Sequence, residues 1–353
     1  MYLKTLSIVS LQQRLATTRA ARKTARGCPL LATMAFSLAA TFAMALSGCE
    51  ATTSVETTAS ASEDGQNSAH PIFWQVDSKA TPAGEAGSRL YLLGSIHVGP
   101  KEGWQLPAST LAHFEQASAL VVEVDMSEGT DEQQDNAVLG YGLLPPGESV
   151  KNHISKDVYE SLEKYIENSG RSMVNINQWR AWMVATMLLS FEVQRLGYPT
   201  EAGLDLELMA RVSSAQRIIG LETMSEQLAL LGGMSPANQE LMLKDMLLQT
   251  DDIEAYFNEL KEAWRNGDEA GLTTVLFREL EATPELAPFY EKVIYGRNET
   301  MCARLDTLMQ NGETLFGVVG AYHLVGPRGI PACLSARGYE VKRLDRAAAE
   351  DSP

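Results

Sequence analysis

The sequence predicts an α/β (α+β) fold, in which a mixed central sheet is formed by two pseudo-symmetric strand, Gly-x-x-His, helix, strand repeats with a helical cap inserted between them. Two observations support this prediction. The stretches LYLLGSIHVGP (90–100) and TLFGVVGAYHLVGP (314–327) are apolar strands that stop at a glycine and show a histidine three residues later. In the segment between them, apolar residues recur mainly at helical spacing. This spacing predicts that the helical cap spans about residues 140–290.

In the first repeat, residues 90–93 form a buried strand, and Gly94 permits a tight turn or a close approach of two backbones. His97 follows just past the end of the strand. A helical stretch over about 108–116 then leads to the strand ALVVEVD, which carries Glu123. A single histidine beside an apolar run is usually a hydrogen-bonded structural residue, so this repeat alone does not predict a site.

The second repeat has the same order of parts. Its strand ends at Gly320 and is followed by His323, a helical stretch over about 330–336 and the strand YEVKRLD. The chain has only five histidines, and two of them occupy equivalent strand ends. This internal repeat favours a shared functional role for the two histidines.

The segment between the repeats contains further recognisable elements. WRAWMVATMLLSFEVQRLG (179–197) predicts a buried core helix, because its uncharged part is too short to span a bilayer. Residues 235–267 begin with Ser-Pro and predict either one long amphipathic helix or a pair of helices. The short run QRIIGLE predicts one more strand, with Glu222 at its end.

The N-terminal part has the composition of a leader. Residues 1–48 hold six basic and no acidic residues and end in an apolar run followed by LSGC, which resembles a bacterial lipoprotein processing site with Cys49 as the acylated residue. A plain transmembrane anchor is the alternative. Residues 49–70 are rich in Ser, Thr and Ala and predict a disordered tether. The folded domain is expected over 71–346, followed by a short tail over 347–353.

The charge of the chain limits its partners. Without the leader, 23 basic residues remain against 45 acidic ones, a net charge of −22, so nucleic acid is not an expected partner. The expected partner is a peptide or small-molecule substrate, with membrane contact only through the lipid anchor.

The predicted lipid anchor places the protein in the bacterial cell envelope, on the inner or outer membrane, with its folded domain in the periplasm. The oligomeric state cannot be inferred from the sequence.

Two of the four cysteines belong to the predicted domain. Cys302 and Cys333 lie in the helical stretches on either side of the second Gly-x-x-His strand. In an oxidising compartment these two residues are compatible with a disulfide, and equally with two buried thiols, because the sequence does not give their separation.

The residues at the strand ends allow hydrolytic chemistry. His97, His323, Glu123 and Glu222 all lie where short apolar runs stop, and two imidazoles with one or two carboxylates suit Zn, Mn, Co or Fe with a position left open for water. A metal-free mechanism is also chemically sound, with one histidine as a base oriented by Glu123. No Gly-x-Ser-x-Gly elbow, His-Glu-x-x-His helix or phosphate-binding glycine loop is present. Ser95 is therefore interpreted as a small turn residue, not a nucleophile.

Six fragments, in order, resemble the TraB/GumN family: LGSIHVG, VVEVD, GLDLELMARV, GLETMSEQLALL, YGRNETM and GAYHLVG. Relatives of that family include the Tiki metalloproteases and, more distantly, the erythromycin esterase and ChaN-like proteins. The resemblance covers residues 71–344. It implies a metal-dependent, peptidase-like hydrolase with a divalent ion and a site core of His97, Glu123 and His323.

The same resemblance points to Asp205, Glu222 and Arg297 as further site positions that contact the substrate or support the core. Each has a structural alternative. Asp205 is also suited to cap the following helix, Glu222 to cap or pair with the next one, and Arg297 to hold a carboxylate in an ion pair.

Two classes of function are compatible with these observations. The first is an envelope-anchored hydrolase of peptide, amide or ester bonds, either metal-dependent or using the histidines and glutamate alone. The second is a lipoprotein that binds a peptide, haem or a metal without turning it over. The convergence of two imidazoles and a carboxylate favours the enzyme.

Overall fold

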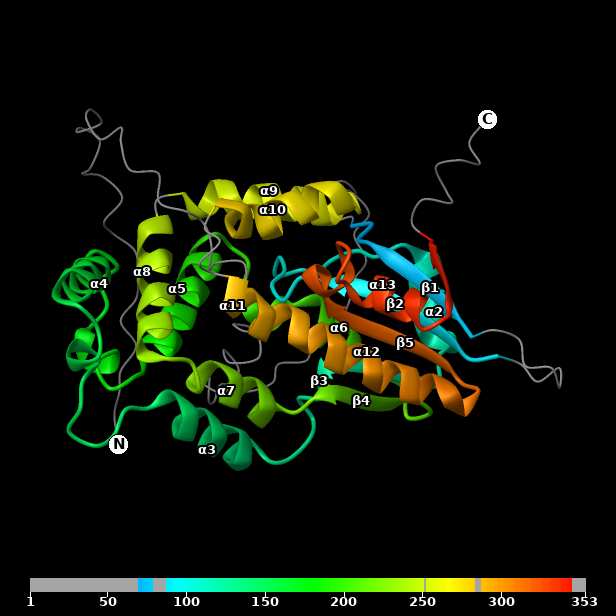
Figure 1. Cartoon of the computed structure of the whole chain (residues 1–353), viewed down its shortest axis with the longest axis horizontal. Helices are drawn as coiled ribbons and strands as arrows, with labels where there is room; N and C mark the ends of the chain where they lie inside the picture. Colours follow the sequence, from blue (N-terminus) through cyan, green and yellow to red (C-terminus); the bar gives the residue numbers. More distant parts are fainter. Residues whose placement is uncertain (1–68, 79–86, 251, 283–286, 345–353) are drawn as a thin grey trace.

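The computed structural model describes residues 69–78, 87–250, 252–282 and 287–344 (Figure 1). The predicted leader, Cys49, nearly all of the predicted tether and the predicted tail lie outside these residues. Among the helices that are described, none is both long and apolar enough to cross a membrane.

Six strands form one mixed sheet in the order β4-β3-β5-β2-β1-β6. The strands are β1 (Phe73–Asp77), β2 (Arg89–Ser95), β3 (Ala119–Val124), β4 (Arg217–Glu222), β5 (Thr314–Gly320) and β6 (Glu340–Arg343). Strands β2 to β5 are parallel to one another, whereas β1 is antiparallel to both of its neighbours. The predicted α/β class and the mixed sheet are confirmed.

The two Gly-x-x-His strands are neighbours at the centre of this sheet. β2 pairs with β5 in parallel, and Ser95 lies opposite Gly320 at the last register position. Parallel strands end at the same edge of a sheet, so both motifs leave it side by side. α2 (Ala108–Gln116) leads from β2 to β3, and α13 (Ile330–Ala336) leads from β5 to β6.

The equivalence of the two repeats is interrupted by β1. β3 lies directly beyond β5, but β1 separates β2 from β6. This strand was not predicted from the sequence, because FWQVD is short and mixes large apolar with polar residues. β1 pairs with β2 on one side and with β6 on the other. These tertiary contacts stabilise a strand whose local sequence gives only a weak strand signal.

Gly94, one residue before the end of β2, allows the two Gly-x-x-His motifs to approach each other closely. A Cβ atom at this position would lie 2.8 Å from Cγ1 of Ile72 and 3.2 Å from Cα of Ala321, which directly follows the second strand. The two motifs therefore pack backbone against backbone. The indole Nε1 of Trp264 also donates to the Gly94 carbonyl at 2.9 Å, which ties the helical segment to this point.

The segment between β3 and β5 is largely helical. Its helices are α3 (Asp131–Gly142), α4 (Lys156–Asn168), α5 (Ala181–Arg195), α6 (Leu204–Ala210), α7 (Met224–Gly232), α8 (Pro236–Gln249), α9 (Ile253–Arg265), α10 (Glu269–Ala282), α11 (Ala287–Tyr290) and α12 (Gly296–Leu308). α5 is the predicted core helix, and residues 235–267 form a helix pair, α8 and α9. Figure 1 shows α4, α5 and α8 beyond the end of the sheet toward which β5 runs.

A disulfide joins Cys302 in α12 to Cys333 in α13, with their Cα atoms 6.4 Å apart. Of the two arrangements compatible with the sequence, the structure has the bridged one. The bridge fixes α12, which contacts β4, to the helix that leads into β6. Because α12 also carries Arg297, the disulfide helps to hold one of the predicted site residues in place.

Candidate active site

The three predicted core residues meet at one point. Nε2 of His97 and Nε2 of His323 each lie 3.7 Å from the same carboxylate oxygen, Oε1 of Glu123. All three side chains are buried, and His323 has no exposed surface. They come from the carboxyl ends of β2, β3 and β5, the edge where sites assemble in parallel α/β sheets.

His97 is oriented by Asp205. Its Nδ1 lies 2.9 Å from Oδ1 of Asp205, and because a carboxylate only accepts, Nδ1 carries a proton. Asp205 reaches this position because α6 packs on the His97 backbone: a Cβ at Gly203 would lie 2.9 Å from the His97 carbonyl carbon. Gly203, not Asp205, is the N-cap of α6, so Asp205 belongs to the site and does not cap the helix.

His323 is oriented by Asn298, a residue that the sequence analysis missed. Nδ1 of His323 hydrogen bonds to Oδ1 of Asn298. Asn298 follows Arg297 directly in the fragment YGRNETM, and nothing in that fragment distinguishes an inward-facing asparagine from a solvated one. Its burial in α12 supplies the evidence for a role.

Arg297 joins the two glutamates. Its Nη2 lies 2.6 Å from Oε2 of Glu123 and 2.6 Å from Oε2 of Glu222, and its Nε lies 3.0 Å from the same Glu222 oxygen. Its Nη1 donates to the Tyr322 hydroxyl at 3.0 Å, a contact that the sequence analysis also missed. The N-cap of α7 is Thr223, so Glu222 acts in this cluster and does not cap the helix. The predicted positions therefore form one connected network.

The two imidazole nitrogens that face Glu123 have no hydrogen-bond partners among the described residues. Oε1 of Glu123 accepts from the Gly320 N–H at 2.7 Å, but neither Nε2 of His97 nor Nε2 of His323 has a hydrogen-bond partner in the described part of the chain. The distance of 3.7 Å to Glu123 is too long for a hydrogen bond. A neutral imidazole that faces a buried carboxylate with its lone pair is repelled by it, and a cation between them removes that repulsion.

The buried charges also favour a cation. The cluster holds three carboxylates and one guanidinium: Arg297 pairs with Glu123 and Glu222, and Asp205 pairs with His97. With neutral imidazoles the cluster has a net charge of −2, which a divalent ion would neutralise. Among the described residues, no group of three or more His, Cys, Asp or Glu side chains is arranged as a formed metal site. The match between this cluster and a metal ion rests on the chemistry of its donor atoms. Two unpaired imidazole nitrogens and one carboxylate oxygen suit Zn, Mn, Co or Fe.

Without an ion, the three core residues titrate differently. Burial disfavours the charged form of His97, but Asp205 and Glu123 outweigh burial and raise the pKa of His97 to about 10. Burial lowers the pKa of His323 against the opposing effect of Glu123. Burial disfavours the ionised form of Glu123, but His323 and Arg297 hold the pKa of Glu123 well below its usual range. The ion-free site thus has a charged His97, a neutral His323 and an ionised Glu123 at neutral pH.

The raised pKa of His97 predicts a pH dependence of stability in the ion-free protein. A group whose pKa rises on folding stabilises the fold fully below its unfolded value, near 6.5, and this contribution is lost as the pH rises toward about 10. Its slope is at most about 1.4 kcal/mol per pH unit. Urea unfolding in chelator at pH 7 and 9.5 should show this loss, and Asp205→Asn should reduce it. Equal slopes in both proteins would contradict the assignment of the proton to His97.

A small cavity adjoins the core residues. It measures about 20 Å³, enough for one water molecule, and touches His97, Glu123 and Asp205. The rest of its wall is apolar and consists of Val122, Val124, Met126, Leu206 and Val318.

Ser95 is the last residue of β2, so it is a strand residue and not the predicted turn residue. Its buried hydroxyl has no hydrogen-bond partner among the described residues.

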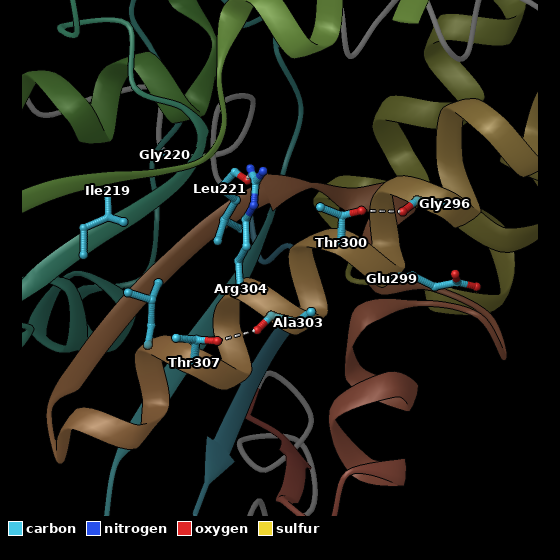
Figure 2. A pocket seen from close by; sticks show the side chains of 10 residues that line it. Ile219, Gly220, Leu221, Gly296, Glu299, Thr300, Ala303, Arg304 and Thr307 are labelled. Carbon is cyan, nitrogen blue, oxygen red and sulfur yellow. Dashed lines mark hydrogen bonds between the residues drawn. The ribbon is translucent and has the colours of Figure 1, made fainter.

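A larger hollow of about 720 Å³ lies elsewhere, between β4 and α12 (Figure 2). It is lined by Ile219, Gly220, Leu221, Gly296, Glu299, Thr300, Ala303, Arg304, Thr307 and Leu308. None of the three core residues lines it, although Leu221 and Gly296 adjoin Glu222 and Arg297 in the chain. The small cavity is therefore the one that bears on the chemistry.

Comparisons with known proteins identify the family of the chain. The model of the TraB/PrgY/gumN family matches residues 74–343. The uncharacterized protein YbaP of Escherichia coli (strain K12) is 24% identical over 246 residues, which cover 69% of this chain and 87% of YbaP. No solved structure matches the chain.

More distant relatives are named metalloproteases. Metalloprotease TIKI2 of Danio rerio is 24% identical over 304 residues, and metalloprotease TIKI1 of Homo sapiens is 22% identical over 304 residues. The matches cover 71% of this chain but only 58% and 59% of those relatives. The resemblance found in the sequence is thus confirmed, and because the family match spans most of the chain, the protein belongs to the TraB/PrgY/gumN family.

Proposed function

We propose that the protein is a metal-dependent hydrolase that cleaves a peptide, amide or ester bond. One observation carries the proposal: two buried imidazole nitrogens without partners among the described residues face one oxygen of an ionised glutamate. The names of the TIKI relatives support a metalloprotease-like reaction, at 22–24% identity.

The residues of the chain have distinct roles in this proposal. His97, His323 and Glu123 would hold the ion, which when bound lowers the pKa of a water molecule and polarises a substrate carbonyl. Asp205 orients His97 through Nδ1. Arg297 keeps Glu123 ionised and aims its Oε1 away from the guanidinium. The apolar wall of the small cavity limits the water that reaches the reacting atoms.

A metal-free hydrolase is the second candidate, because the two imidazoles differ in charge without an ion. His97 is protonated and His323 is neutral at neutral pH, and both lie 3.7 Å from Glu123 Oε1. An acid and a base on either side of one carboxylate can protonate a leaving group and activate water without a metal.

The test is turnover with and without divalent ions. The purified protein is treated with a chelator, assayed against peptide and ester libraries, and assayed again after addition of Zn²⁺, Mn²⁺, Co²⁺ or Fe²⁺. We expect chelation to abolish hydrolysis and at least one ion to restore it. His97→Ala and His323→Ala should be inactive, and His153→Ala, which alters a partly exposed histidine paired with Glu148, should stay active.

Two other outcomes would overturn the metal proposal. Hydrolysis that survives exhaustive chelation would establish the metal-free mechanism. Capture of peptides or haem with no turnover of any substrate would establish a binding lipoprotein in place of an enzyme.

We also propose that the protein is anchored in the bacterial envelope through a lipid on Cys49, with its folded domain in the periplasm. The sequence LSGC, followed directly by a polar segment, supports this placement. Mass spectrometry of the mature protein should find a lipid-modified Cys49 at the N-terminus. Retention of residues 1–48 would contradict it.

A further inference from the structure

We infer that Asn298 is a positioning residue that holds the ring proton of His323 on Nδ1, so that the Nε2 lone pair faces Glu123. Only the use of that lone pair, as a ligand for an ion, rests on the proposed function. The position of the proton follows from the contacts of Asn298 itself.

The orientation of the Asn298 amide is fixed by a backbone carbonyl. Its Nδ2 donates to the carbonyl oxygen of Arg328 at 2.8 Å, and a carbonyl only accepts. The other amide atom, Oδ1, therefore points to His323 and accepts from its Nδ1. If the amide were flipped, its oxygen would face the Arg328 carbonyl oxygen, and its NH₂ group would point away from Arg328. Nδ1 of His323 thus carries the proton.

The segment that carries the Arg328 carbonyl is also linked to the helices beside it by ion pairs. The guanidinium of Arg328 pairs with Glu291 at 2.6 Å and with Glu299 at 3.2 Å. Glu291 begins a π-helical segment, Glu291–Tyr295, that runs directly into α12. The loop after His323 is therefore fastened to the helix that carries Asn298, and Asn298 is 2% exposed. A buried amide with both ends bonded has a single orientation available.

The competing tautomer would close the site. A proton on Nε2 of His323 would point at Oε1 of Glu123, 3.7 Å away, and an ionised carboxylate is a stronger acceptor than an amide. A small movement of either side chain would form that hydrogen bond. The lone pair would then lie on Nδ1, away from the site. Asn298 opposes this outcome by offering an acceptor to Nδ1.

An amide suits this position better than a carboxylate. Asp205 performs the same task for His97 and adds a negative charge to the site. A second carboxylate at position 298 would raise the buried net charge from −2 to −3, more than a divalent ion neutralises, and would repel the Arg328 carbonyl. The neutral amide orients the ring without that cost.

Nitrogen NMR of the histidine rings tests the inference. The protein is labelled with ¹⁵N-histidine and freed of metal, and the signal of His323, one of five histidines, is assigned from the variant His323→Gln. We expect the wild-type ring to be the Nδ1–H tautomer. In Asn298→Leu we expect the Nε2–H tautomer and an affinity for Zn²⁺ that is about 10- to 100-fold lower.

Two further variants separate positioning from general damage. Asn298→Asp keeps the acceptor, so Nδ1 of His323 should stay protonated even where Asn298→Leu folds poorly. Asn266→Leu removes an exposed amide that donates to the Glu262 carbonyl, and it should leave both the tautomer and the Zn²⁺ affinity unchanged.

A wild-type Nε2–H tautomer would overturn the inference, as would a folded Asn298→Leu protein with the wild-type tautomer. A wild-type Nδ1–H tautomer in a protein that binds no Zn²⁺ would leave the inference standing and would count against the proposed function. The two failures are thus distinguishable.

Discussion

The variant Glu123→Gln is expected to lower kcat/KM by about 10²- to 10⁴-fold. Glutamine keeps the shape of the side chain and can still accept the Gly320 N–H, but it removes the charge that faces both imidazoles. Steady-state kinetics and metal analysis of the same preparation check this prediction. Turnover lost with the ion retained would assign proton transfer to Glu123, and loss of both would assign it as a ligand.

The matched control for this variant is Glu226→Gln. Glu226 also pairs with an arginine of α12, because its Oε1 lies 2.8 Å from Nη2 of Arg304, but it is half exposed and lies outside the site. Its replacement should leave kcat/KM within about twofold of wild type. Wild-type activity in Glu123→Gln would remove Glu123 from the chemistry.

The variant Arg297→Met is expected to cost about 3–5 kcal/mol in the free energy of unfolding. Methionine leaves Glu123 and Glu222 buried within one cluster without the guanidinium that contacts both at 2.6 Å. Two uncompensated carboxylates repel each other and lose their solvation. Urea denaturation near pH 7 measures the change.

Two comparisons test the cause of that loss. Arg304→Met removes a more exposed ion pair on the same helix and a hydrogen bond to the Leu221 carbonyl, and it should lower the free energy of unfolding by only about 1–2 kcal/mol. Adding Glu222→Gln to Arg297→Met should recover part of the loss, because one of the two stranded charges is gone. Similar effects of Arg297→Met and Arg304→Met would show that the buried cluster is not an electrostatic unit.

The core of the site could be predicted from the sequence because it depends on strand ends. His97, Glu123 and His323 each lie where a short apolar run stops or is about to stop, and the carboxyl ends of parallel strands lie at a common edge. The repeat then identified β2 and β5 as related strands, and the structure makes them neighbours. No distance between side chains was needed for that step.

The supporting residues could not be predicted in the same way, because their roles depend on tertiary placement. Asn298 and Tyr322 act through contacts between α12 and the segment that follows β5, and the local sequence does not show which side chains face each other there. Likewise, the spacing of Cys302 and Cys333 is compatible with free thiols until their Cα separation is known. β1 exists because β2 and β6 pair with it, not because of a strong local signal.

The resemblance to a family identified Asp205, Glu222 and Arg297, but not what each one does. For all three, the sequence left a structural alternative that the geometry decides. Asp205 and Glu222 do not cap helices, and Arg297 does form an ion pair, with the two glutamates of the site itself. The ion pair that the sequence left as the structural alternative is therefore made within the candidate site itself.

Metal analysis of the purified protein tests most directly whether His97, Glu123 and His323 hold a divalent ion. After loading with the ion that restores activity and removal of the excess, we expect about one ion per wild-type chain and about none in folded His323→Ala. The expected loss follows from the Nε2 atom of His323, which has no partner among the described residues. Equal ion content in the two proteins, with both folded, would contradict the proposed metal site.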